Sequence, residues 1–248
     1  MSSVAERTTP ARPAGRTRRS TASVVQGLVI ALGFVMMVGG FALIAVDYRP
    51  YKIPTASMTP TLAIGDTVLA RKADGGSVGR GDIVVFQDDT WGAESMVKRV
   101  VAVGGDTVAG DERGRLTVNG TPVREPYLED KPILSVAFSV AVPEGRLFLL
   151  GDDRTNSLDS RSHLELAAGT VPATGVQARV EAIVLPFSRA GTQSRTTAFD
   201  GLGGEPAHQP GPLVPAAWAA AGGAATVVLA SAAGGAVQLV RRLRGRRA

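Results

Sequence analysis

Cysteine is absent from all 248 residues of the chain. Its absence excludes a thiol nucleophile, disulfide bonds and thiolate metal sites together. Histidine is almost as scarce, because only His163 and His208 occur, and His208 lies in a segment rich in Gly and Pro. A Ser-His-Asp arrangement therefore has one poor candidate base. We expect any nucleophilic serine of this chain to depend on an amine, which is a known variant of the same chemistry.

Charged residues are missing from two long stretches, the 27 residues 20–46 and the 30 residues 211–240. Each stretch is long enough to cross about 30 Å of hydrocarbon as a helix, so we expect transmembrane helices over residues 20–46 and 212–240. A cleavable secretory signal is the alternative for the first stretch. It is less favoured because the apolar run exceeds the roughly 7–15 residues of a signal core, and no clear A-x-A site follows.

The net charge of +5 is unevenly distributed along the chain. Residues 1–19 and 241–248 together carry +9, mostly from ten arginines, which leaves −4 for everything between them. Arginine clusters beside apolar spans mark the cytoplasmic side of a membrane. We therefore expect basic cytoplasmic tails at 1–19 and 241–248, two passes through the plasma membrane, and an extracytoplasmic domain between them. This topology accounts for the basicity without a nucleic-acid partner.

The residues between the two spans predict β structure. Short runs rich in Val, Ile, Leu and Phe are separated by Gly, Asp and Pro, at residues 67–71, 82–86, 96–103, 134–142, 146–150 and 179–185. Residues 115–118 and 121–124 flank Asn119 and Gly120, a strong hairpin signal. Only residues 163–168 suggest a helical turn.

These patterns define the expected fold class and domain organisation. We expect a mainly β protein, with a folded, antiparallel and barrel-like extracytoplasmic domain over residues 47–188. Residues 189–211 are rich in Gly, Thr, Ser and Pro and are predicted to form a flexible linker to the second span.

A serine flanked by prolines follows the first span closely. Residues 53–62 read IPTASMTPTL, and their two prolines favour a shaped loop over a helix or a central strand. Taken alone, a serine in such a loop is most often a turn residue. Eleven residues separate Val46 from Ser57. Ser57 therefore lies at most about 36–40 Å from the end of the first span.

A lysine lies on the apolar face of one predicted strand. Within residues 96–103, Lys98 shares its face with Met96, Val100 and Ala102. Burial disfavours the ammonium form and lowers the pKa of an amine, which would make Lys98 a usable base near neutral pH. In the alternative, the amine reaches solvent while the stem packs. This segment alone slightly favours that simpler interpretation.

A third block, residues 151–161, reads GDDRTNSLDSR and directly follows a strand typical of a core. Such a run is either a solvated loop or a hydrogen-bonded scaffold beneath a catalytic site. Together with the serine block 53–62, GDIVVF at 81–86 and the lysine block at 97–106, it resembles the bacterial type I signal peptidases. These are membrane-bound serine-lysine proteases, and the resemblance covers roughly residues 24–190.

The resemblance implies a role for four residues at the reacting centre. Ser57 corresponds to the nucleophile and Lys98 to the general base. Thr55 occupies the position of a serine whose hydroxyl stabilises the oxyanion, and threonine keeps that hydroxyl. Ser157 corresponds to the serine that orients the lysine by a hydrogen bond.

The resemblance also implies supporting and binding residues. Asp159 and Arg161 match a supporting ion pair, and Ile53 and Val97 match positions beside shallow pockets that accept small substrate side chains. The substrates would be the signal peptides of preproteins and the other partner a lipid bilayer, with neither a metal nor a cofactor. The oligomeric state stays open.

Two alternatives remain open at this point. A related family of self-cleaving repressor proteins also uses serine and lysine, but its members are soluble and cytoplasmic. A membrane-anchored β domain that binds a protein partner without catalysis is the alternative from another class. Asp153 and Thr155 differ from the Asn and Asp more usual in the signal peptidases, and these departures touch the scaffold rather than the pair Ser57 and Lys98.

Overall fold

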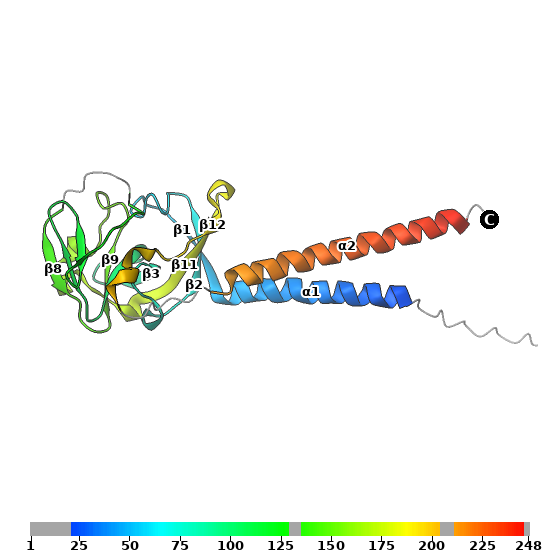
Figure 1. Cartoon of the computed structure of the whole chain (residues 1–248), viewed down its shortest axis with the longest axis horizontal. Helices are drawn as coiled ribbons and strands as arrows, with labels where there is room; N and C mark the ends of the chain where they lie inside the picture. Colours follow the sequence, from blue (N-terminus) through cyan, green and yellow to red (C-terminus); the bar gives the residue numbers. More distant parts are fainter. Residues whose placement is uncertain (1–20, 129–134, 204–210, 246–248) are drawn as a thin grey trace, which may run out of the picture. The chain divides into compact units, whose positions relative to one another are not determined.

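The computed structural model describes residues 21–128, 135–203 and 211–245 of the chain (Figure 1). They divide into two compact units. One unit is Ala42–Ala216, and the other contains the described residues up to Phe41 and from Ala217 onward.

Two long helices make up the smaller unit, and their residues 42–47 and 213–216 are assigned to the larger one. Helix α1 covers Thr21–Asp47 and helix α2 covers Leu213–Gly245, with mean hydropathies of 2.6 and 1.7. Both are long and apolar enough to cross a membrane. Helix α2 continues beyond the predicted limit at residue 240, because the arginine-rich residues that follow have good helix propensity.

Small residues bring the two helices together inside their own unit. A Cβ atom on Gly33 of α1 would lie 2.9 Å from the carbonyl oxygen of Gly223 on α2. The Gln26 side-chain amide donates a 2.8 Å hydrogen bond to the carbonyl oxygen of Ala230. Contacts of this kind let helix backbones approach closely in an apolar medium.

The larger unit is a β domain of two antiparallel sheets, which confirms the mainly β fold class. The eight-stranded sheet has the order β1-β2-β11-β3-β4-β9-β10, with β12 paired to β11. Its strands are β1 Tyr48–Lys52, β2 Thr67–Lys72, β3 Ile83–Asp88, β4 Gly92–Val103, β9 Arg146–Leu150, β10 Val171–Pro172, β11 Val176–Leu185 and β12 Gly191–Thr192. The four-stranded sheet has the order β7-β6-β5-β8. Its strands are β5 Thr107–Gly110, β6 Leu116–Val118, β7 Thr121–Pro122 and β8 Phe138–Ala141.

Local signals in the sequence account for most of these strands. The predicted runs at 67–71, 82–86, 96–103, 146–150 and 179–185 lie within or overlap β2, β3, β4, β9 and β11. Asn119 and Gly120 have φ of 52° and 76°, the left-handed pair that a tight turn between β6 and β7 requires. The predicted turn at 163–168 is instead two 3₁₀ turns, Ser160–His163 and Ala167–Gly169.

Strand β4 runs through the middle of the domain and touches three apolar clusters. Val97 packs on one cluster, Val101 on a second and Val100 on a third. Both faces of β4 are therefore covered, and the strict alternation assumed from the sequence does not hold here. For this reason Arg99 is buried alongside Lys98, with exposures of 2% and 5%.

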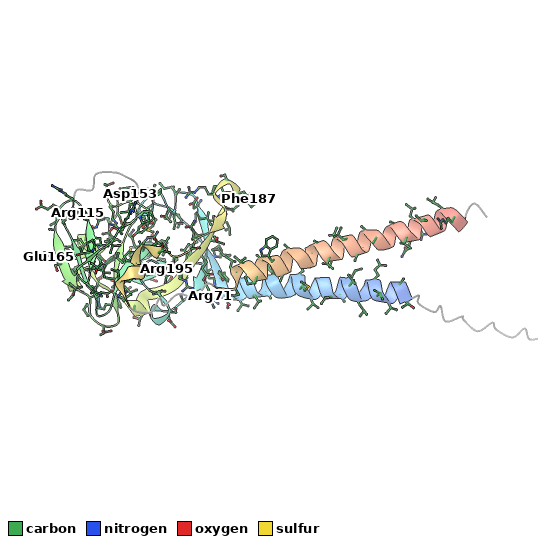
Figure 2. All side chains as sticks on the ribbon, viewed as in Figure 1. Arg71, Arg115, Asp153, Glu165, Phe187 and Arg195 are labelled. Carbon is green, nitrogen blue, oxygen red and sulfur yellow. The ribbon has the colours of Figure 1, made fainter. Side chains whose placement is uncertain are left out.

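Residues 189–203 do not form the flexible linker that composition predicted. Arg189 pairs with Asp66, β12 pairs with β11, and Phe199 is buried in the cluster beside the smaller sheet. Phe187 by contrast projects from the connection between β11 and β12 (Figure 2). A few packed side chains outweigh the Gly- and Thr-rich composition of this segment, and the rest of the predicted linker, 204–210, lies outside the described residues.

Candidate active site

The serine block, residues 53–62, is a closed loop between β1 and β2. Ile53 donates a backbone hydrogen bond to Asp66 and accepts one from Gly65, so the two ends of the loop are joined. Met58 and Leu62 are buried at 1% and 0% exposure in the same apolar cluster as Ile53. These anchors fix the backbone on either side of the serine.

Ser57 and Lys98 meet at the edge of this loop. The Lys98 Nζ donates a 2.8 Å hydrogen bond to the Ser57 Oγ. Lys98 is held on β4 by its pairing with Val84 of β3. Both residues are buried, with exposures of 9% and 5%, so the structure brings together two residues that are 41 positions apart.

Burial decides the electrostatics of the amine. It lowers the pKa of Lys98 below the ordinary lysine value, while the carboxylates of Asp159 and Asp152 oppose the shift. Lys98 is thus the buried amine rather than the solvent-reaching lysine of the alternative interpretation. A neutral amine at hydrogen-bond distance from a hydroxyl can accept its proton.

Thr55 lies on the open side of the serine. Its Oγ1 is 3.4 Å from the Ser57 Oγ, and either hydroxyl can be the donor. Among the described residues, the Ser57 N–H makes no backbone hydrogen bond. One hydroxyl and one backbone N–H therefore lie beside the nucleophile, which is the donor set of an oxyanion hole.

The polar block 151–161 contacts the backbone of Ser57. The Asp153 N–H donates a 3.1 Å hydrogen bond to the Ser57 carbonyl oxygen. The Ser157 Oγ packs so closely on Gly151 that an added Cβ would be 2.1 Å away. This hydroxyl is buried and has no hydrogen-bond partner among the described residues, so the hydrogen bond to Lys98 implied by the resemblance is not formed in this structure.

Asp159 and Arg161 form the expected ion pair. The carboxylate of Asp159 is fully buried and accepts 2.9 Å hydrogen bonds from the Arg161 side chain and a 3.0 Å bond from the Gly151 N–H. The Thr155 hydroxyl donates a 2.8 Å hydrogen bond to the Asp153 carboxylate. The two residues that depart from the family pattern are therefore hydrogen-bonded to each other.

A second ion pair beside Ser57 and Lys98 was not predicted from the sequence. The Arg99 guanidinium donates two hydrogen bonds, of 2.8 and 2.6 Å, to the carboxylate of Asp152. Thr61 of the serine block donates to the same carboxylate. One pair therefore ties the serine, lysine and polar blocks together. Arg99 follows Lys98 directly in a predicted core strand, and that position was the available signal.

A cavity of about 200 Å³ opens beside the two residues. It is lined by residues of the β1 end, the serine block, β3 and β4, among them Ile53, Thr55, Ser57, Val97 and Lys98. Ile53 and Val97, which were expected to lie beside substrate pockets, thus line the same cavity as Ser57 and Lys98. In the part of the chain that the structure describes, no three His, Asp or Glu side chains gather as metal ligands would.

Fold and site together are those of a membrane-anchored peptidase of mainly β structure. The family model described as "Signal peptidase, peptidase S26" matches residues 22–185. The chain therefore belongs to the peptidase S26 family of signal peptidases.

Two relatives agree with this family. Signal peptidase I of Mycobacterium tuberculosis is 34% identical over 242 residues, which covers 76% of this chain and 80% of that protein. Signal peptidase I U of Bacillus subtilis is 37% identical over 145 residues, covering 54% and 76%. The chain is also similar to a crystal structure of a signal peptidase I from Enterococcus faecalis. The match covers 41% of this chain and 94% of that one, with 27% sequence identity and a TM-score of 0.34.

Proposed function

We propose that this protein is a membrane-bound serine endopeptidase that removes signal peptides from exported preproteins through the dyad Ser57 and Lys98. The observation that carries the proposal is the 2.8 Å contact between the Lys98 Nζ and the Ser57 Oγ beside an open cavity. The names of the relatives support the substrate class.

Acylation begins with the neutral amine. Lys98 takes the proton of the Ser57 hydroxyl as the Ser57 Oγ forms a bond to the scissile carbonyl carbon. The negative charge that develops on the carbonyl oxygen is stabilised by the Ser57 N–H and the Thr55 hydroxyl. Lys98, now an ammonium, gives the proton to the leaving amine, and the C–N bond breaks to leave an ester on Ser57.

Deacylation repeats the same proton transfers with water. Lys98 removes a proton from the water that attacks the ester carbonyl, and the proton returns to the Ser57 Oγ as the C–O bond breaks. The substrate lies extended beside the β1 end and β4, as in β-strand addition. The small volume of the cavity favours small side chains near Ile53 and Val97.

The proposed topology has both termini in the cytoplasm and the β domain outside the plasma membrane. It is supported by the arginine clusters beyond both apolar helices. Protease added from outside to intact cell membranes should digest the β domain, and a cytoplasmic position of Ser157 would overturn the topology.

The test of the activity uses the detergent-solubilised full chain and a preprotein with small residues before the cleavage site. Ser57→Ala and Lys98→Ala should each abolish cleavage, while Ser139→Ala, an exposed serine on β8, should cleave normally. Full activity of Lys98→Ala would refute the dyad. Absence of cleavage by the wild-type protein would favour a binding domain without catalysis.

A further inference from the structure

Arg99 is held beneath Ser57 and Lys98 by an ion pair, by a 2.8 Å hydrogen bond from its Nη1 to the Gly81 carbonyl oxygen, and by an aromatic ring. One edge of its guanidinium makes the bidentate pair with Asp152. Its face lies over the ring of Tyr127, with the guanidinium carbon 4.0 Å from the ring centroid. The ring comes from a segment after β7 that none of the four sequence blocks includes. A desolvated guanidinium over an aromatic face is a favourable cation–π contact.

A second buried pair fixes the tyrosine. The Tyr127 hydroxyl donates to Glu125, and Glu125 accepts a 2.9 Å hydrogen bond from Arg154 of the polar block. Burial raises the pKa of Tyr127 well above its ordinary value, so the hydroxyl stays a donor. The side chains of Arg99, Arg154 and Glu125 are only 3%, 4% and 6% exposed. Water therefore does not replace this contact.

The charges that face Lys98 show why the position of Arg99 matters. Asp152 and Asp159 both favour the ammonium form of Lys98. Asp152 is paired with Arg99, the next residue on the strand, and Asp159 is paired with Arg161. The serine block 53–62 contributes no charged residue, while Lys52 of β1 and Glu94 of β4 line the same cavity as Lys98 and are the same in every variant compared. An Arg99 that left Asp152 would expose Lys98 to an unpaired carboxylate.

We propose that Tyr127 is a positioning residue of this peptidase, whose ring keeps the Arg99 guanidinium on Asp152. Glu125 accepts a hydrogen bond from the tyrosine hydroxyl, but the ring alone makes the contact with Arg99. A fixed ion pair on Asp152 favours the neutral form of Lys98, whose amine is directed at Ser57. The inference rests on the proposed dyad chemistry.

Two variants of Tyr127 separate the ring from the hydroxyl. Tyr127→Phe keeps the ring and retains most of the activity, with an unchanged pH profile. Tyr127→Leu removes the ring and shifts the acid limb of kcat/KM upward by about one pH unit, because the freed carboxylate stabilises the ammonium. At a pH on that limb, kcat/KM falls about tenfold, since only the neutral amine acts.

Phe138→Leu is the matched control. Phe138 packs on the same apolar cluster as Tyr127, but its ring partner is Phe148 and not an arginine. The control is expected to lower the midpoint of thermal unfolding and leave the acid limb in place. An acid limb in Tyr127→Leu no further shifted than in Phe138→Leu would overturn the inference.

Two further outcomes are distinguishable. If Tyr127→Leu does not fold, Tyr127→Met, whose flexible side chain fills irregular space, gives the same comparison. Failure of the wild-type protein to cleave, or cleavage by Ser57→Ala, would overturn the proposed function itself. If the wild-type protein cleaves with an acid limb, and the acid limbs of Tyr127→Leu and Phe138→Leu do not differ, only the proposed role of Tyr127 is refuted.

Discussion

Gly151→Ala is expected to displace the backbone of the nucleophile. An added Cβ at Gly151 would lie 2.5 Å from the Ser57 carbonyl oxygen and 2.1 Å from the Ser157 Oγ. The Ser157 hydroxyl can rotate away, but the Ser157 Cβ also lies 2.5 Å from the added atom, and the Ser57 carbonyl oxygen is held by the Asp153 N–H at 3.1 Å. The backbones of Ser157 and Ser57 therefore both have to move.

The size of the movement follows from the contact distances. The carbonyl oxygen is about 0.9 Å short of the 3.4 Å at which contact with a Cβ becomes ordinary. A misplacement of about 1 Å at a reacting group costs on the order of 100-fold in rate. Overpacking at such a site also lowers the free energy of unfolding by about 1–3 kcal/mol. Activity should thus fall far more than stability.

The measurement is kcat on a preprotein, with thermal unfolding of the same sample. Gly191→Ala is the matched control, because nothing lies within 4 Å of its added Cβ and its φ is not in the left-handed range. It should leave kcat unchanged and stabilise the fold slightly. Wild-type kcat in folded Gly151→Ala would show that the Ser57 backbone is not held by this contact.

Three further variants or conditions test separate parts of the structure. Cleavage should decline as the pH falls through the lowered pKa of Lys98, because the ammonium cannot accept a proton, and a profile that is flat on the acid side would contradict this. Thr55→Val should lower kcat by about 100- to 1,000-fold while Thr55→Ser retains activity, since only the hydroxyl is needed at the oxyanion. Phe199→Ala should lower the free energy of unfolding by about 3–5 kcal/mol in denaturant titrations. An unchanged midpoint would show that residues 197–202 do not contribute to the core.

Local patterns predicted the β strands well because their causes are local. Alternating apolar residues, Gly and Pro boundaries and the Asn119–Gly120 pair each act within a few residues. The linker prediction failed for the opposite reason. Phe199 and Arg189 are held by partners far away in the chain, and composition carries no information about such partners.

The candidate site shows the same division. Ser57 and Lys98 were predicted from the resemblance of their sequence blocks to the signal peptidases, and the structure brings the two side chains into contact. Arg99 and Tyr127 could not be predicted, because charged and aromatic residues in strands and loops are usually exposed or simply packed. Their contact depends on a fold that covers β4 on both faces.

Burial of Lys98 should lower the free energy of unfolding, because it disfavours the ammonium form of the amine. The unfolded chain keeps this lysine protonated to a higher pH than the folded one, so the folded state binds fewer protons and its stability rises with pH between the two pKa values. Each unit by which the pKa is lowered costs about 1.4 kcal/mol below that range. Lys98→Met should therefore be inactive yet more stable than the wild type at neutral pH, with a gain in the free energy of unfolding that shrinks as the pH rises. Ser57→Ala removes activity without removing a titrating group and should show no such trend; a gain for Lys98→Met that did not change with pH would show that the amine is not neutral in the folded protein.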